Sequence, residues 1–164
     1  MEQEYNTIKK FYGDKTAKRS GVPLMNHIDE GLEILKSLNA SQTELAAFCL
    51  HPIVQNSEDV DFVTSMSVLK LAEEYRDKAN AYLCRPENDN ILFTEQLTPK
   101  LDGGMSLSCR RLLFADKVQN QKDFLIYHAS THDRRRNLRL YFNLWLVYLS
   151  NDQFFDGSLV RKAL

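Results

Sequence analysis

The sequence predicts an all-α protein, a single-domain bundle of six to eight helices over residues 1–150 followed by a C-terminal tail at 151–164. Every strongly periodic segment repeats its apolar residues at helical spacing. No pair of alternating apolar segments flanks an Asn-Gly or Asp-Gly turn, which is the usual signature of a hairpin. Six glycines and four prolines among 164 residues also suit helices better than many short strands.

Two helices are expected in the N-terminal third of the chain. The first covers residues 26–38, and its apolar face carries Ile28, Leu32 and Leu35. Ser41 and Glu44 then have the spacing of a capping box, so a second helix begins after them. We expect that helix to be interrupted near Pro52, because proline has no N–H to donate.

Three further segments complete the bundle. A long helix is predicted over residues 68–83. Ser106 or Ser108 caps the next helix, which extends to Tyr127 with one continuous apolar stripe formed by Leu112, Leu113, Ala115, Val118, Phe124 and Leu125. After a break at 128–132, the last helix presents Leu138, Phe142, Trp145, Leu146 and Leu149.

Charge and hydropathy argue against two classes of partner. Lys and Arg number 21 and Asp and Glu number 22, so no overall positive field attracts a polyanion, which disfavours general nucleic-acid binding. The longest apolar runs are far shorter than the roughly 20 residues that span a bilayer, which predicts no transmembrane helix. Residues 1–5 are polar and acidic, unlike a secretory signal, so we expect a cytoplasmic protein.

Two histidines and one aspartate are the candidate metal ligands. His27, His51 and Asp116 fall on three different predicted helices. Two imidazoles and a carboxylate in the core of a helical bundle are typical ligands of a divalent transition metal. Spacing alone leaves a second interpretation open, in which both histidines are hydrogen-bonded interior residues and Asp116 lies on a helix surface.

Four motifs resemble those of a known family and occur in the same order. Residues 19–27, R-S-G-V-P-L-M-N-H, are similar to R-x-G-x-P-Y-I-x-H, and residues 46–51, A-A-F-C-L-H, occupy the place of an A-A-L-L-H-D helix. Residues 113–120, L-F-A-D-K-V-Q-N, resemble L-A-D-K-x-x-N, and residues 139–142 fall where an E-Y-F element stands. The chain therefore resembles the HD-domain hydrolases of the RelA/SpoT type, which include the small alarmone hydrolases.

The resemblance implies an HD-domain-like helical fold, a Mn²⁺ ion and removal of the 3′-diphosphate from ppGpp. The positions that match the family's metal ligands are His27, His51 and Asp116. Asn120 and Tyr141 match residues that hold the nucleoside, and Arg19 matches a basic residue beside the purine. Arg139, close to a run of arginines before the last helix, is expected to add a phosphate contact.

The central motif departs from the family. Where the family has H-D-x-x-E-D, residues 51–56 read H-P-I-V-Q-N, so all three acids are missing. Loss of the aspartate beside the histidine removes an oxygen ligand and lowers the affinity for Mn²⁺. Gln55 and Asn56 cannot accept a proton from water, and such general-base assistance is commonly worth about 10²–10⁴-fold. Glu58 and Asp59 are the nearest substitutes.

The sequence thus predicts a catalytically degenerate HD-domain protein that binds a purine or signalling nucleotide, such as ppGpp, without efficient hydrolysis and with no metal or weakly bound Mn²⁺. One alternative is an active metal-dependent nucleotide phosphohydrolase with shifted ligands. Another is a protein–protein interaction module with an empty pocket. A homo-oligomer or a protein partner also stays open.

Overall fold

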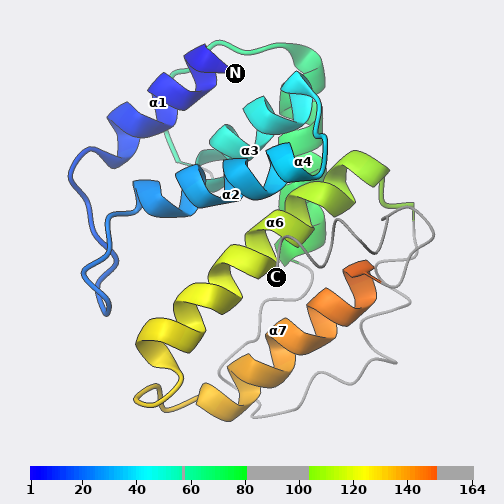
Figure 1. Ribbon diagram of the computed structural model, residues 1–164. Helices are drawn as coiled ribbons and strands as arrows, with labels where there is room; N and C mark the ends of the chain where they lie inside the picture. Colours follow the sequence, from blue (N-terminus) through cyan, green and yellow to red (C-terminus); the bar gives the residue numbers. More distant parts are fainter. Residues whose placement is uncertain (57, 81–103, 151–164) are drawn as a thin grey trace.

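The computed structural model describes residues 1–56, 58–80 and 104–150, and every regular element in these ranges is a helix (Figure 1). The elements are α1 (Glu2–Tyr12), α2 (Met25–Ser37), α3 (Gln42–Gln55), α4 (Met66–Asn80), α6 (Leu107–Asp123), the π-helix η1 (Phe124–His128) and α7 (Arg135–Ser150). The predicted all-α bundle of six to eight helices is confirmed. The C-terminal tail at 151–164, and the end of the predicted helix at 68–83 beyond Asn80, lie outside the described residues.

Helix α3 is the centre of the bundle. Every residue from Glu44 to Val54 is buried, as expected for a helix that is covered on all sides. α1, α2, α4 and α6 all pack against it, whereas α7 lies along α6 (Figure 1). A side chain on α3 can therefore meet side chains from several other helices in the interior.

The predicted helix starts follow the expected capping chemistry. The Ser41 hydroxyl accepts a hydrogen bond from the Glu44 amide at 3.3 Å, and the Glu44 carboxylate accepts one from the Ser41 amide at 2.6 Å. This is a complete capping box at the start of α3. Ser106, rather than Ser108, caps α6 by accepting a hydrogen bond from the Cys109 amide.

The expected interruption at Pro52 is wrong, because α3 continues through this residue to Gln55. In a regular helix the amide of residue 52 would donate to the carbonyl of Phe48. That carbonyl lies 2.6 Å from Nδ1 of His51 instead. A side-chain donor thus replaces the missing backbone donor, and burial of the surrounding residues holds the helix together.

The continuous stripe predicted up to Tyr127 is also wrong at its end. α6 stops at Asp123 and a π-helix follows it. A π-turn contains more residues than an α-turn, so the side chains after it are rotated out of phase. Phe124 remains buried, whereas Leu125, Ile126 and Tyr127 are exposed.

Helix α1 had no counterpart in the sequence prediction. Its apolar residues Tyr5, Ile8, Phe11 and Tyr12 recur at helical spacing and pack on the core, so this helix could have been predicted from the sequence. Among the described residues, no helix combines the length and the apolar character that crossing a membrane requires.

Gly31 allows α2 and α3 to approach closely. A Cβ atom built on Gly31 would lie 2.2 Å from Cε1 and Cζ of the Phe48 ring. The Phe48 ring has little room to move away, because it is fully buried and packs against the rings of His27 and His51. The helix tolerates a glycine here because only a hydrogen atom fits.

We expect Gly31→Ala to destabilise the protein by about 1 to 3 kcal/mol through overpacking, although alanine favours a helix by about 1 kcal/mol over glycine. Urea denaturation would measure the difference. Asn26→Ala, at an exposed position of the same helix, is the control and should stay within about 0.5 kcal/mol of the unmodified protein. Equal stability of the two variants would show that α2 and α3 are free to separate.

Candidate metal and ligand site

Three helices bring His27, His51 and Asp116 to one point. His27 is near the start of α2, His51 lies in the buried part of α3, and Asp116 lies in the middle of α6. One ligand atom from each residue can be chosen so that all three atoms lie within 4.8 Å of one another. The structure therefore unites the three candidate ligands, although 65 residues separate the second from the third.

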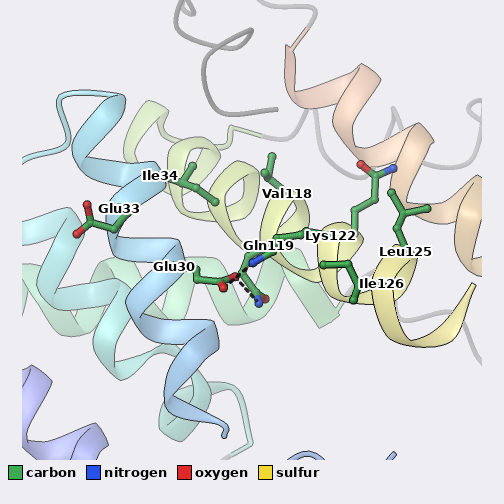
Figure 2. A pocket seen from close by; sticks show the side chains of 9 residues that line it. Glu30, Glu33, Ile34, Val118, Gln119, Lys122, Leu125 and Ile126 are labelled. Carbon is green, nitrogen blue, oxygen red and sulfur yellow. Dashed lines mark hydrogen bonds and ion pairs between the residues drawn. The ribbon is translucent and has the colours of Figure 1, made fainter. Parts of the chain in front are cut away.

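Gln119 determines which nitrogen of His27 carries a proton. Its amide nitrogen donates to Asp123 at 2.8 Å and to Glu30 at 3.3 Å, which fixes the orientation of the amide. The amide oxygen then faces Nδ1 of His27 at 2.6 Å, so Nδ1 is the donor. Figure 2 shows Gln119 beside Glu30, at the edge of a cleft between α2 and α6. The remaining nitrogen of His27, Nε2, points toward Asp116.

His51 is fixed in the same tautomer by a different acceptor. Its Nδ1 lies 2.6 Å from the carbonyl oxygen of Phe48, which can only accept a hydrogen bond. Burial lowers the pKa of His51 to about 3. The ring is therefore neutral near pH 7, with a lone pair on Nε2.

The Nε2 atoms of the two histidines face each other. Nε2 of His27 is 3.2 Å from Nε2 of His51, and Oδ1 of Asp116 lies 3.4 Å from the first and 4.0 Å from the second. Acceptors at such distances repel one another unless a proton or a cation lies between them. Two imidazole nitrogens and one carboxylate oxygen are a donor set that suits a divalent transition metal.

Asp116 remains ionised although it is buried. Lys117 donates to its Oδ2 atom at 2.6 Å, and Asn120 donates to its Oδ1 atom at 2.8 Å. Burial by itself would raise the pKa of Asp116, but the charge of Lys117 and the hydrogen bond that Lys117 donates lower it to about 2. The Lys117 ammonium, itself buried, lies over the rings of Trp145 and Tyr141 at 5.3 Å and 5.7 Å.

A pocket of about 310 Å³ opens beside the three candidate ligands, within the size range of small-molecule sites. Its polar lining also includes Tyr12, Gln55, Asn56, Gln119, Asn120 and Asp123. Burial and the charge of Asp116 raise the pKa of Tyr12 to about 12, so its hydroxyl keeps its proton near pH 7. The carboxylates in this lining are those of Asp116 and Asp123.

Of the predicted ligand-binding residues, Asn120 lines the pocket, whereas the others and the two possible substitute acids lie elsewhere. Arg19, Arg139, Glu58 and Asp59 are exposed and do not line the pocket. Tyr141 was expected to face a ligand, but it is buried and its ring contacts those of Phe142 and Trp145. It lies one helical turn before Trp145 and so shares the core-facing side of α7.

Sequence reasoning did not assign a role to four residues of the site: Tyr12, Lys117, Gln119 and Asp123. Lys117 matches a fixed letter of the motif at 113–120, which is a signal that could have found it, whereas Gln119 falls on a variable position of that motif. Tyr12 and Asp123 carry no comparable signal. Tyr12 reaches the pocket from the end of α1, and only the packing of α1 brings it there.

Comparisons with known proteins add no relative: no protein-family model, curated protein or solved structure matches this chain. The resemblance to HD-domain hydrolases therefore stays a prediction from the motifs.

The burial of His51 predicts a loss of stability in acid. Below pH 6.5 the unfolded chain takes up a proton on His51, whereas the folded protein does so only near pH 3. Each unit of this difference is worth about 1.4 kcal/mol, so we expect the free energy of unfolding to fall by about 4 to 5 kcal/mol between pH 6.5 and pH 3. Urea denaturation of chelator-treated protein would measure this.

The control for this prediction is His51→Gln, which removes the titrating ring. This variant should lose much less stability over the same pH interval than the unmodified protein. The low pKa of Asp116 acts in the same direction at lower pH, because its stabilisation is lost as pH falls from about 4 toward about 2. Parallel pH profiles for the two proteins would contradict the assignment of His51 as a neutral buried ring.

Proposed function

We propose that this chain is a catalytically degenerate, HD-domain-like protein that binds a purine nucleotide, such as ppGpp or a related signalling nucleotide, without efficient hydrolysis. One observation carries the proposal. His27, His51 and Asp116 were selected by motif resemblance, and these residues, distant in sequence, lie together beside one pocket. Unrelated helical packing gives no reason for three motif-matched residues to converge.

The donor set fits a divalent transition metal. His27, His51 and Asp116 would supply three ligands to the ion and leave further coordination positions open. When bound, such an ion supplies positive charge for a phosphate oxygen of the ligand. A fourth protein ligand is missing because residue 52 is proline, so Mn²⁺, which prefers oxygen, is held weakly or not at all.

Beside the carboxylates of Asp116 and Asp123, the pocket lining offers neutral hydrogen-bond donors to an anion. Tyr12, Gln55, Asn56 and Asn120 are neutral groups that can donate hydrogen bonds to phosphate oxygens. A carboxylate at residue 55 or 56 would instead repel a phosphate by about 4 kcal/mol at 4 Å with an effective dielectric constant of 20. The presence of Gln55 and Asn56 in place of acids thus removes proton acceptors and also removes the repulsion of a bound phosphate.

One observation favours a second candidate, an active phosphohydrolase with shifted groups. Asp123 lines the pocket and its carboxylate accepts a hydrogen bond from Gln119 at 2.8 Å. A carboxylate in this place is a potential proton acceptor for an attacking water. Because Glu58 and Asp59 do not line the pocket, Asp123 is a better candidate for that role.

Nucleotide binding is tested by thermal denaturation with and without Mn²⁺. At a ppGpp concentration about one hundred times its Kd, binding stabilises the folded state by about 2.7 kcal/mol. For a domain of this size, we expect Tm to rise by about 5 to 10 °C. Asn56→Ala should reduce the rise, measured from its own ligand-free Tm. Asn6→Ala, which alters an exposed amide on α1, is the matched control. No shift with any purine nucleotide would contradict the proposal.

Turnover is tested by release of pyrophosphate from ppGpp in excess Mn²⁺. We expect none above the blank from the unmodified protein. The triple variant Pro52→Asp, Gln55→Glu, Asn56→Asp should gain hydrolysis, because it restores a proton acceptor together with a carboxylate metal ligand, and the gain from that ligand outweighs the effect of the N–H that the same substitution returns to α3. Each single substitution should add little hydrolysis, because a metal ligand without a proton acceptor, or a proton acceptor without a metal ligand, does not activate water.

The same assay separates the two candidate functions. Robust hydrolysis by the unmodified protein that His51→Ala abolishes would favour the phosphohydrolase. Loss of that activity in Asp123→Asn, with folding retained, would then identify Asp123 as the proton acceptor.

A further inference from the structure

Pro52 lies in the interior of α3, where proline is normally unfavourable. It is buried and forms part of the pocket wall next to His51. Because its nitrogen carries no hydrogen, the carbonyl of Phe48 has no backbone donor one turn further along the helix. An unpaired buried carbonyl is costly, so a replacement donor is needed.

Nδ1 of His51 is that donor, at 2.6 Å from the Phe48 oxygen. The His51 ring is also enclosed by aromatic neighbours, with ring centroids 4.7 Å from that of Phe48 and 4.8 Å from that of Tyr75. The ring therefore has a fixed position, and the hydrogen bond decides which nitrogen bears the proton. A neutral imidazole holds one proton, so Nδ1–H leaves the lone pair on Nε2.

We propose that Pro52 is a positioning residue that acts through the Phe48 carbonyl to hold His51 in the Nδ1–H tautomer, with its Nε2 lone pair directed at His27 and Asp116. A residue with an N–H at position 52 would donate to the same carbonyl and compete with His51. In the family that this chain resembles, the residue at this position is a metal ligand. Here Pro52 occupies the position and instead orients the neighbouring candidate ligand, His51. The inference concerns the metal-free protein, and only its metal-binding test rests on the proposed function.

The tautomer is read directly from the ¹⁵N resonances of the histidine rings, which differ for protonated and unprotonated nitrogens. In metal-free protein near pH 7, we expect His51 to be wholly in the Nδ1–H form. Pro52→Ala, which restores the backbone donor, should convert a large part of His51 to the Nε2–H form. Pro52→Val also restores the donor but keeps more of the buried bulk, so agreement between the two variants assigns the effect to the N–H rather than to lost packing.

His27 provides the internal control. Its Nδ1 donates to Gln119, so His27 should stay in the Nδ1–H tautomer in both Pro52 variants. In Gln119→Met, which removes that acceptor, the His27 tautomer should change and the His51 tautomer should stay. A purely structural role for Pro52 would alter Tm without this selective change in one ring.

Metal affinity is the second measurement, with Zn²⁺ as the probe in competition with a chromophoric chelator. Loss of a hydrogen bond that orients a histidine ligand typically weakens metal binding 10–100-fold, so we expect the Zn²⁺ Kd of Pro52→Ala to rise about tenfold. An unchanged His51 tautomer in both Pro52 variants would overturn the inference, because the carbonyl would then be accepting both bonds. If the tautomer changes but the unmodified protein does not bind Zn²⁺, the role of Pro52 holds and the metal part of the proposed function fails.

Discussion

The ionised carboxylate of Asp116 inside the bundle determines how its neighbours are arranged. Without a partner, a buried charge would be strongly destabilising. Lys117 neutralises Oδ2, and Oδ1 is left to Asn120 and the two imidazoles. The Lys117 ammonium in turn lies against the aromatic rings of α7. The packing of α7 and the geometry of the candidate site are therefore linked through one ion pair between adjacent residues.

Much of the fold followed from local patterns, because caps and apolar periods act within a few residues. The capping box before α3 and the apolar face of α7 are examples. The errors arose where contacts distant in sequence or unusual backbone geometry override such patterns. Pro52 is tolerated because a side chain replaces its hydrogen bond, and the π-helix η1 rotates Leu125 outward. Neither effect has a signature in the spacing of residues.

The residues of the candidate site were also predicted only in part from the sequence. Motif resemblance selected His27, His51 and Asp116, and the structure brings these residues together. Their spacing alone could not do so, since convergence depends on how three helices pack. Gln119 was missed because its role is to orient His27 from a helix 92 residues away in sequence. Tyr141 was misplaced because it lies one helical turn before Trp145 and shares the buried side of α7.

The span of these contacts has a consequence for folding. His27 and Gln119 are separated by 92 positions, as are Lys122 and Glu30, so the contact between α2 and α6 joins distant parts of the chain. Long-range contacts of this kind carry the loop-closure entropy of the whole intervening segment. We therefore expect the ligand cluster to assemble late in folding and to come apart early whenever α6 separates locally from α2.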